Sequence, residues 1–370
     1  MEETPLYFKS EDILKKILKE PFKFQKIDDK LIVKKERGNG FRSRPTSFIF
    51  PRIIKIKSST AGLIVGEGYI GSSFIFCNSN EKIIINILNF LSQFDVKAHF
   101  SLEVAMKNME KEFIETSKKK WENIIKEEIK KIRIRNEFNN TTEKGNIHIS
   151  IYNIIFSKVL KKIVEGIKDK SEEDKEIAKN YLKGILAAEG NINVKRTTTN
   201  CLYMVRISAK KVSEREHYKR VLKNIGINIY CKDMPTISKE EGSKLGWKTT
   251  KGRAGAVLIS RWENFLKILL LDLLELHKDK RQKFARHFIY NKFTKQFLSF
   301  GSFINKEFTM IEAKNKFHLK ANSIRGVKTL AKQGYISKKL VNKNNRLISY
   351  YTLTPRYIKT YDKLKQELSI

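Results

Sequence analysis

The sequence predicts an α+β fold made of two related modules followed by a basic C-terminal segment. Three observations support this prediction. A short apolar motif occurs twice, each copy leads into the same strand–helix pattern, and residues 301–370 follow a pattern of their own. The chain has 370 residues, enough for two or three domains, and 41% of them are hydrophobic, which allows a sizeable core.

Two short stretches match each other and end in the same two residues. Residues 61–68 read AGLIVGEG, and residues 183–190 read KGILAAEG. Each predicts an apolar helix with small residues on one face, closed by a carboxylate and a glycine. A helix dipole disfavours negative charge at the helix C-terminus. Two such ends in register therefore indicate that a positive group, a metal ion, lies between them.

A second repeat lies downstream of each motif. Residues 149–170 align without gaps onto residues 259–280, and both segments predict a short strand followed by an amphipathic helix ending in Lys-Asp-Lys. This offset is 110 residues (259 − 149), whereas the offset between the motifs is 122 (190 − 68). The first copy must therefore carry extra residues. We predict that they form one long charged helix over residues 103–135.

The segments after the two motifs differ. Residues 191–209 predict a β-hairpin, while residues 69–77 leave room for one strand only. Helices are predicted next, over residues 83–94 and 214–225. Each module then reads as helix, strand or hairpin, helix, strands and helix.

We place the first module at residues 51–170 and the second at 171–290. An N-terminal extension, residues 1–50, precedes them and contains a short helix over residues 10–19 with Ser10 as its cap. Residues 40–57 could replace the strand that the first module lacks.

Residues 301–370 predict a winged helix-turn-helix. Helices over residues 309–317 and 322–332 are followed by strands over residues 335–341 and 347–353. This segment has 15 Lys and Arg against 4 Asp and Glu, a net charge of +11. The alternative is a small helical cap that does not contact nucleic acid.

The charge of the whole chain favours a polyanionic partner. There are 75 Lys and Arg against 40 Asp and Glu, a net charge of +35. Nucleic acid is the first expectation and an anionic membrane surface the second. The membrane interpretation is weak, because no apolar run is long enough to span a bilayer and the acidic start does not resemble a signal peptide. Cys77, Cys201 and Cys231 show no metal or disulfide spacing, which indicates buried thiols in a reducing compartment.

The paired motifs resemble the signature of the LAGLIDADG homing endonucleases in their two-repeat monomeric form. The resemblance covers about residues 51–290 and implies two αββαββα modules. It also implies that the two signature helices pack at a pseudo-twofold axis and that the sheets straddle the DNA major groove. By motif position, it implies that Glu67 and Glu189 bind divalent metal, with the backbone carbonyls of Gly66 and Ala188 facing the same ions. The expected ion is Mg²⁺, with Mn²⁺ as a substitute.

The residues themselves support close helix packing. Small residues at positions i and i+4 let two helices touch, and the pairs Gly62/Gly66 and Gly184/Ala188 have this spacing. Gly68 and Gly190 would end the two helices sharply.

Two lysines are predicted to complete the catalytic site. Lys170 and Lys280 end the two Lys-Asp-Lys segments, and the resemblance suggests that they stabilise charge or orient water. The equally good alternative is that both simply match the helix dipole.

Basic residues in three regions are predicted to contact DNA. They lie in the hairpin, in a basic loop that could equally be a plain hairpin loop, and in the C-terminal segment. They are Lys195, Arg196 and Arg206; Lys248, Lys251 and Arg253; and Arg325, Lys328, Lys343 and Arg346.

We therefore predict a monomeric, site-specific endonuclease that cuts both strands of double-stranded DNA. We expect it in the cytoplasm, associated with the nucleoid of a prokaryote, with an organelle as the alternative. Related proteins that have lost cleavage act as DNA-binding regulators, and others are maturases that bind intron RNA. The presence of both acids, each followed by its glycine, favours the endonuclease.

Overall fold

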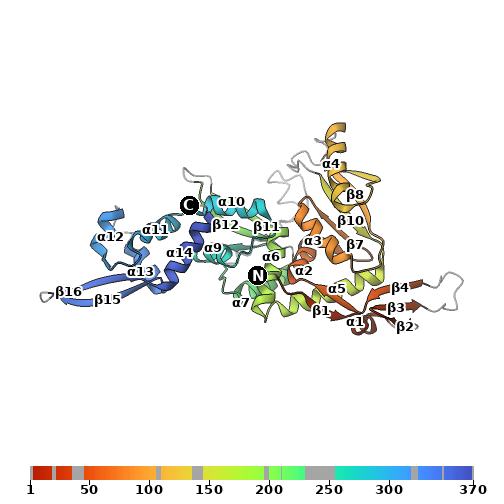
Figure 1. Cartoon of the computed structure of the whole chain (residues 1–370), viewed down its shortest axis with the longest axis horizontal. Coiled ribbons are helices and arrows are strands. Elements are labelled where there is room, and N and C mark those ends of the chain that lie inside the picture. The colour runs from red at the N-terminus through yellow and green to blue at the C-terminus, as the bar shows by residue number, and fades with distance from the viewer. Residues whose placement is uncertain are drawn as a thin grey trace, which may run out of the picture. The chain divides into compact units, whose positions relative to one another are not determined.

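The computed structural model has a mixed α+β fold, as the sequence predicts (Figure 1). The structure describes residues 3–18, 22–35, 46–105, 110–135, 145–195, 200–209, 211–229, 255–317, 324–343 and 346–368. The chain divides into two compact units. The first comprises Met1–Gly190, Ile207–Val257 and Leu273–His277, and the second comprises Asn191–Arg206, Leu258–Asp272 and Lys278–Ile370. These units do not coincide with the four predicted segments, whose boundaries stay a prediction.

The N-terminal residues form two small antiparallel sheets around one helix. Their elements are β1 (Leu6–Lys9), α1 (Ser10–Ile17), β2 (Phe22–Ile27), β3 (Lys30–Lys35), β4 (Thr46–Pro51) and β5 (Ile53–Ile56). β1 pairs with β5, and β2, β3 and β4 form a meander. Helix α1 confirms the predicted helix, but Lys9 is its N-cap residue, and the Ser10 hydroxyl instead donates to the Pro51 carbonyl at 2.5 Å. The prediction that residues 40–57 replace a strand of the first module is wrong, because β4 and β5 pair only within these two sheets.

A five-stranded sheet dominates the first unit, in the order β6-β7-β10-β8-β9. Its strands are β6 (Gly68–Ile70), β7 (Phe74–Asn78), β10 (Asn146–Ile151), β8 (His99–Ala105) and β9 (Lys131–Arg135). Neighbours are antiparallel except β8 and β9, which are parallel. The first motif is therefore followed by a short hairpin, β6–β7, and the prediction of a single strand there is wrong. The hairpin could not be predicted from the sequence because β6 has only three residues. The turn follows at Gly71, whose N–H donates to the Ser73 carbonyl at 3.0 Å.

The predicted helix over residues 103–135 is also wrong. The described part of this segment contains the end of β8, helix α4 (Lys111–Ile125) and strand β9. Lys126 is the C-cap residue of α4 and adopts a left-handed φ of 59°. The Glu122 side chain accepts a hydrogen bond from the Ile129 N–H at 2.8 Å. The run of Lys and Glu favours helix locally, but the alternation Lys-Ile-Arg-Ile-Arg is that of a strand.

One face of the five-stranded sheet carries the core. Helices α3 (Glu81–Leu91) and α5 (Ile154–Lys170) confirm the two predicted helices. The ring of Phe156 contacts Phe74 of β7 at 6.1 Å and Phe94 at 5.1 Å, in both cases edge to face. Phe74, Phe76 and Phe156 are fully buried.

The opposite face of the same sheet is polar. Since strand side chains alternate, the residues between the core positions share this second face. We call this group the polar face. Its polar members are Tyr69, Cys77, His99, Ser101, Glu103, Lys131, Arg133, Asn146, His148 and Ser150, and its apolar members are Ile75 and Ala105.

The second motif helix leads directly into a second sheet. The elements are α6 (Lys175–Glu189), β11 (Gly190–Val194), β12 (Leu202–Ser208), α7 (Val212–Asn224), β13 (Ala256–Ile259) and α9 (Trp262–Leu270), and the strand order is β11-β12-β13. Strands β11 and β12 confirm the predicted hairpin, and α7 confirms the helix after it.

The downstream repeat does not extend to its predicted end. Helix α5 ends at Lys170, but α9 ends at Leu270, and Asp272 then takes a left-handed φ of 50°. Residues 278–280 begin a separate helix, α10 (Lys278–Phe288). The two Lys-Asp-Lys segments therefore lie at opposite ends of their helices, which corrects the predicted equivalence.

The C-terminal residues confirm the predicted order of two helices and two strands. The elements after α10 are α11 (Lys292–Ser299), a 3₁₀ turn (Phe300–Phe303), β14 (Phe308–Thr309), α12 (Met310–Phe317), α13 (Ile324–Lys332), β15 (Ile336–Lys343), β16 (Arg346–Leu353) and α14 (Pro355–Leu368). β16 lies between β14 and β15. Helix α14 was not predicted from the sequence, and it packs within the second unit. The Tyr357 ring stacks on Phe297 at 4.5 Å, and Arg281 binds Glu367 at 2.6 Å.

A charged cluster fixes the corner between α5 and α6. Glu172 lies in the turn between these helices and accepts hydrogen bonds from Arg220 Nε at 2.6 Å and from His217 at 2.7 Å, both on α7. Burial lowers the pKa of His217, so the ring is neutral at pH 7 and its Nδ1–H donates to Glu172. The hydrogen bond from Arg220 is the largest cause that lowers the pKa of Glu172, from 4.5 to about 2. The cluster thereby anchors the start of α6.

Replacing Glu172 with Gln (Glu172→Gln) should lower the free energy of unfolding at pH 7 by about 1 kcal/mol, a modest value because Arg220 is 55% exposed. A carboxylate whose pKa is lowered on folding stabilises the protein above its unfolded pKa of 4.5, and this contribution is lost as pH falls towards about 2. The difference in free energy of unfolding between the variant and the unaltered protein should therefore be largest at pH 7 and decrease below pH 4.5. Urea unfolding from pH 7 down to pH 3 measures it. Glu173→Gln, at the exposed neighbouring carboxylate, is the control, and a deficit independent of pH would contradict the assignment.

Candidate metal centre and nucleic-acid face

The two motif helices, α2 (Ser58–Glu67) and α6, are each anchored by a carboxylate at the N-terminus. Glu3 accepts hydrogen bonds from the Ser59 N–H at 3.0 Å and from the Ser59 hydroxyl at 2.6 Å. Asp174 caps α6 by accepting from the Glu176 and Ile177 N–H groups. Negative charge at a helix N-terminus interacts favourably with the helix dipole, so each carboxylate stabilises the start of its helix.

Helices α2 and α6 pack backbone against backbone. They share the most extensive contact of any two elements in the described structure. A Cβ atom on Gly62 would lie 2.1 Å from the Tyr181 carbonyl oxygen, and one on Gly184 would lie 2.1 Å from the Ser59 carbonyl oxygen. No side chain fits at such distances, so both glycines are required by the approach of the opposite backbone. This confirms the predicted role of the small residues.

The register of this contact repeats the offset between the motifs. Gly62 lies against Gly184, and Gly66 lies against Ala188, so in both pairs the partners are 122 residues apart (184 − 62 and 188 − 66). Equivalent residues face each other in this way where two copies meet at a twofold axis. Because both pairs advance together along the chain, the helices run in the same direction and their C-termini lie at the same end.

Both helices end abruptly at a glycine. The N–H of Gly68 donates to Ile64, and that of Gly190 donates to Leu186, and strands β6 and β11 begin at these same glycines. A Cβ on Gly68 would lie 2.4 Å from the Ile64 carbonyl oxygen, and one on Gly190 would lie 2.3 Å from that of Leu186. The sharp exit from helix to strand is thus the same in both copies, as the sequence predicts.

The acids Glu67 and Glu189 lie at these adjoining ends, and both are half-buried. A Cβ on Gly66 would lie 3.4 Å from Cγ of Glu189, so the Glu189 side chain passes beside the residue that precedes Glu67. Asn78 of β7 donates to Glu67 Oε1 at 3.4 Å. Burial, with smaller contributions from Glu214 and Glu189, raises the pKa of Tyr218 far above its usual value of 10, so this phenol stays neutral near the site.

The donor set of this site fits a hard divalent cation. The two carboxylates and the carbonyls at the two helix C-termini are oxygen groups that could hold such an ion, and the helix dipoles add further negative charge there. Mg²⁺ prefers one or two carboxylates completed by waters and phosphates. Two carboxylates brought together without a cation would repel each other.

The structure does not bring Lys170 next to the acids. Lys170 is exposed at the end of α5, and its ammonium lies 5.9 Å from the centre of the Phe8 ring. Helix α6 starts five residues after Lys170, and Glu189 lies at its opposite end. At about 1.5 Å per residue, the helix separates its two ends by about 20 Å. Lys280 lies near the start of α10 in the second unit.

The predicted DNA contacts lie partly inside and partly outside the described residues. Arg196, Lys248, Lys251, Arg253 and the side chain of Arg325 lie outside the described residues. Lys195 is exposed at the end of β11, and Lys328 is exposed on α13. Lys343 and Arg346 form the last pair of the β15–β16 ladder, and both are exposed.

Two arginines on strands carry a buried Nε with no hydrogen-bond acceptor among the described residues. One is the predicted Arg206 on β12, and the other is Arg133 on β9, which the sequence analysis missed. Arg133 and Lys131 belong to the polar face, and the alternation of β9 was the signal that could have revealed them. Guanidinium groups with an unused donor can bind phosphate or a base edge.

Comparisons with known proteins give distant structural likenesses, of which two are described. No family model and no curated protein sequence matches the chain. The crystal structure of I-DmoI in complex with DNA and Mn matches with 12% identity and a TM-score of 0.33, covering 58% of this chain and 94% of that one. The N-terminal LAGLIDADG domain of DUF199/WhiA matches with 11% identity and a TM-score of 0.33, covering 60% and 83%. Scores this low carry no argument, so the site rests on the geometry of this chain alone.

The part of the chain that the structure describes contains no helix with the length and apolar composition that a bilayer span needs.

Replacing Gly62 or Gly184 with Ala (Gly62→Ala, Gly184→Ala) should lower the free energy of unfolding by about 1–3 kcal/mol each, because the added methyl would force the two backbones apart. Urea unfolding measures the change. Gly166→Ala is the matched control, since its Cβ would meet only Phe8 at 3.8 Å and alanine is favoured inside helix α5. If all three variants were equally stable, the close contact of α2 and α6 would be contradicted.

Proposed function

We propose that the protein is a LAGLIDADG-type, metal-dependent endonuclease that cuts both strands of double-stranded DNA at a specific site. The single observation that carries the proposal is the contact of two parallel helices that both end in Glu-Gly and meet at equivalent residues. A plain structural pair of helices gains nothing from placing an acid at each negative helix end. A cation shared by the two acids accounts for the arrangement.

In this proposal Glu67 and Glu189 hold Mg²⁺, or Mn²⁺ in its place, with the carbonyl oxygens of Gly66 and Ala188 directed at the same ions. When bound, the metal would polarise a water for attack on the phosphodiester and stabilise the leaving oxygen. The protein's own contribution is to hold the two carboxylates at the adjoining, fixed ends of two rigid helices. The neutral Tyr218 and the amide of Asn78 add no charge that competes with the cation.

The DNA in this proposal lies along the polar face. Lys131 and Arg133 would contact phosphates or base edges, and Arg206 would do so from the second sheet. The C-terminal residues would act as a winged helix-turn-helix, with Lys343 and Arg346 at the tip of the wing and Lys328 on the second helix. The protein would work as a monomer with internal pseudo-symmetry, in the cytoplasm with the nucleoid of a prokaryote or in an organelle.

Lys170 and Lys280 remain proposed assistants of catalysis. Lys170 is separated from Glu189 by the length of α6, and Lys280 lies at the start rather than the end of its helix. We therefore propose that both act through the DNA backbone rather than on the metal. Lys170→Ala and Lys280→Ala should then weaken DNA binding more than they slow cleavage of bound DNA.

Replacing either acid with its amide (Glu67→Gln, Glu189→Gln) should reduce cleavage in Mg²⁺ by at least about a hundredfold, because the amide cannot hold the cation. DNA binding should change little. Cognate sites are found by selecting cut molecules from a randomised DNA library, and single-turnover cleavage is then measured. Glu173→Gln, an exposed acid in the turn before α6, is the control and should cut normally.

The outcomes separate the proposed function from its alternatives. Tight site-specific binding by the unaltered protein without cutting in Mg²⁺ or Mn²⁺ would indicate a DNA-binding regulator. Preferential binding to a structured intron RNA would indicate a maturase.

Replacing Lys131 and Arg133 with Ala (Lys131→Ala, Arg133→Ala) should weaken DNA binding and lower the slope of log affinity against log salt by about one for each phosphate that the protein no longer binds. Fluorescence anisotropy over a salt series measures both quantities. Lys161→Ala, an exposed lysine of α5 outside the polar face, changes the net charge equally and serves as the control. Equal effects of all three substitutions would show that the polar face is not the binding surface.

A further inference from the structure

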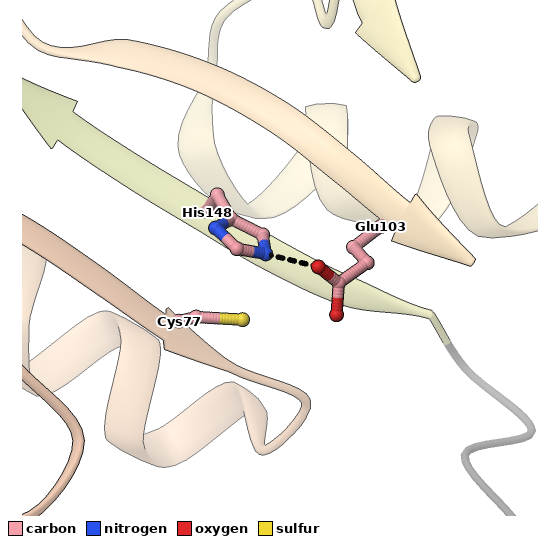
Figure 2. A group of neighbouring side chains, drawn as sticks. All are labelled: Cys77, Glu103 and His148. Atoms are coloured by element: carbon pink, nitrogen blue, oxygen red, sulfur yellow. Dashed lines mark hydrogen bonds and ion pairs between the residues drawn. The ribbon is translucent and has the colours of Figure 1, made fainter. Parts of the chain in front are cut away.

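Three different metal-binding side chains meet on the polar face, and none of them is among the proposed metal ligands Glu67 and Glu189 or the proposed DNA contacts. Cys77 on β7, His148 on β10 and Glu103 on β8 each offer one ligand atom, and these atoms lie within 4.8 Å of one another (Figure 2). They come from three neighbouring strands and from residues 77, 103 and 148, so the sequence shows no ligand spacing. We call this group the Cys-His-Glu cluster.

The sheet register holds the cluster together. Cys77 is the direct partner of His148 in the β7–β10 ladder. Ser101 is the partner of His148 in the β10–β8 ladder, so Glu103, two residues further along β8, lies diagonally across from it on the same face. Cross-strand and diagonal neighbours are within reach of long side chains. The backbone therefore fixes all three ligands before any ion binds.

Hydrogen bonds already orient the Glu103 carboxylate. His148 Nε2 lies 2.9 Å from Glu103 Oε2, and Asn146 Nδ2 donates to the other oxygen, Oε1, at 3.4 Å. Only 13% of the His148 side chain and 17% of the Glu103 side chain are exposed. The cluster is therefore largely shielded from bulk water but keeps a small exposed surface through which an ion could enter.

From this geometry we propose that Cys77, Glu103 and His148 bind one Zn²⁺-class transition-metal ion, with water in the fourth position. Zn²⁺ with sulfur, nitrogen and oxygen ligands places tetrahedral neighbours about 3.4–3.6 Å apart. The cluster reaches this arrangement when its side chains shift by about 1 Å and the ion replaces the His148–Glu103 hydrogen bond.

The ligand chemistry selects the metal. Sulfur and imidazole ligands suit Zn²⁺ and Co²⁺, whereas Mg²⁺ and Ca²⁺ take oxygen ligands almost alone. The ligands bind as thiolate, neutral imidazole and carboxylate, and the thiol proton leaves to solvent. Thiolate and carboxylate together neutralise the charge of Zn²⁺, so the metal-bound site has no net charge and can be buried at low cost. The ion would join β7, β10 and β8 and stiffen the polar face.

Metal titration of the full chain tests this proposal. We expect one thiolate-bound Co²⁺ per chain, seen as a thiolate-to-cobalt charge-transfer band in the near ultraviolet, and displacement of this Co²⁺ by Zn²⁺ but not by Mg²⁺. Cys77→Ser should abolish the band. Cys77→Ser, His148→Ala and Glu103→Gln should each weaken Zn²⁺ binding by more than about tenfold. Cys201→Ser, at the other described cysteine, and His99→Ala, at an exposed histidine of the same face, are the matched controls.

The Glu67→Gln/Glu189→Gln double variant separates this site from the proposed catalytic one. It should bind Co²⁺ with the same band and affinity even where it no longer cuts DNA, so failure of one proposal leaves the other standing. Loss of Co²⁺ binding in this variant, with the band retained in Cys77→Ser, would overturn the inference.

A second measurement does not depend on the ligand variants folding. In Cys201→Ser/Cys231→Ser, Cys77 is the only cysteine in the chain. Zn²⁺ should slow its alkylation by iodoacetamide at least about tenfold, because a metal-bound thiolate is a poorer nucleophile. Equal protection by Mg²⁺, or no protection by Zn²⁺, would show that the cluster is an ordinary ion pair beside a thiol.

Discussion

The approach of two helix backbones is the constraint on which the rest of this structure depends. Helices α2 and α6 meet where Gly62 and Gly184 have no side chains, and the carbonyl of one helix occupies the space that a methyl would need on the other. Such an approach tolerates one register only, because a slip along either helix would bring Leu63 or Ile185 against the opposite backbone. The register in turn brings Gly66 to Ala188 and sets the two acids at adjoining ends.

Several elements of the first unit hold the ends of these two helices. Glu3 and Asp174 anchor the N-termini of α2 and α6, and the Glu172 cluster joins α7 to the corner before α6. At the opposite ends, the chain passes directly from helix to strand at Gly68 and Gly190. Each acid thus connects a rigid helix to a sheet, and a site that must hold cations between two carboxylates needs rigid supports of this kind.

The two copies have diverged around this shared centre. The first sheet has gained a parallel strand, β9, through the β8–α4–β9 connection, and its polar face carries cations beside a cluster of Cys, His and Glu. The second copy ends its last helix early and continues into helices that pack against α14. The two halves therefore share the helix contact and the order of hairpin, helix, strand and helix after it, and they differ in the elements added around this order. The close contact tolerates no change, whereas strands at a sheet edge can be added freely.

The sequence by itself determined the elements whose pattern is local and repeated. The twin Glu-Gly ends, the small residues of α2 and α6, the hairpin β11–β12 and the two helices with two strands near the C-terminus were all predictable, since glycine spacing and hydrophobic periodicity act over a few residues. It failed at β8–α4–β9, where lysine and glutamate favour helix but parallel pairing with β8 outweighs that preference. It also failed at the three-residue strand β6, which is too short for any periodicity. Only the tertiary structure decided the meeting of Cys77, Glu103 and His148, because strand register, which depends on contacts between distant segments, brings these residues to one place.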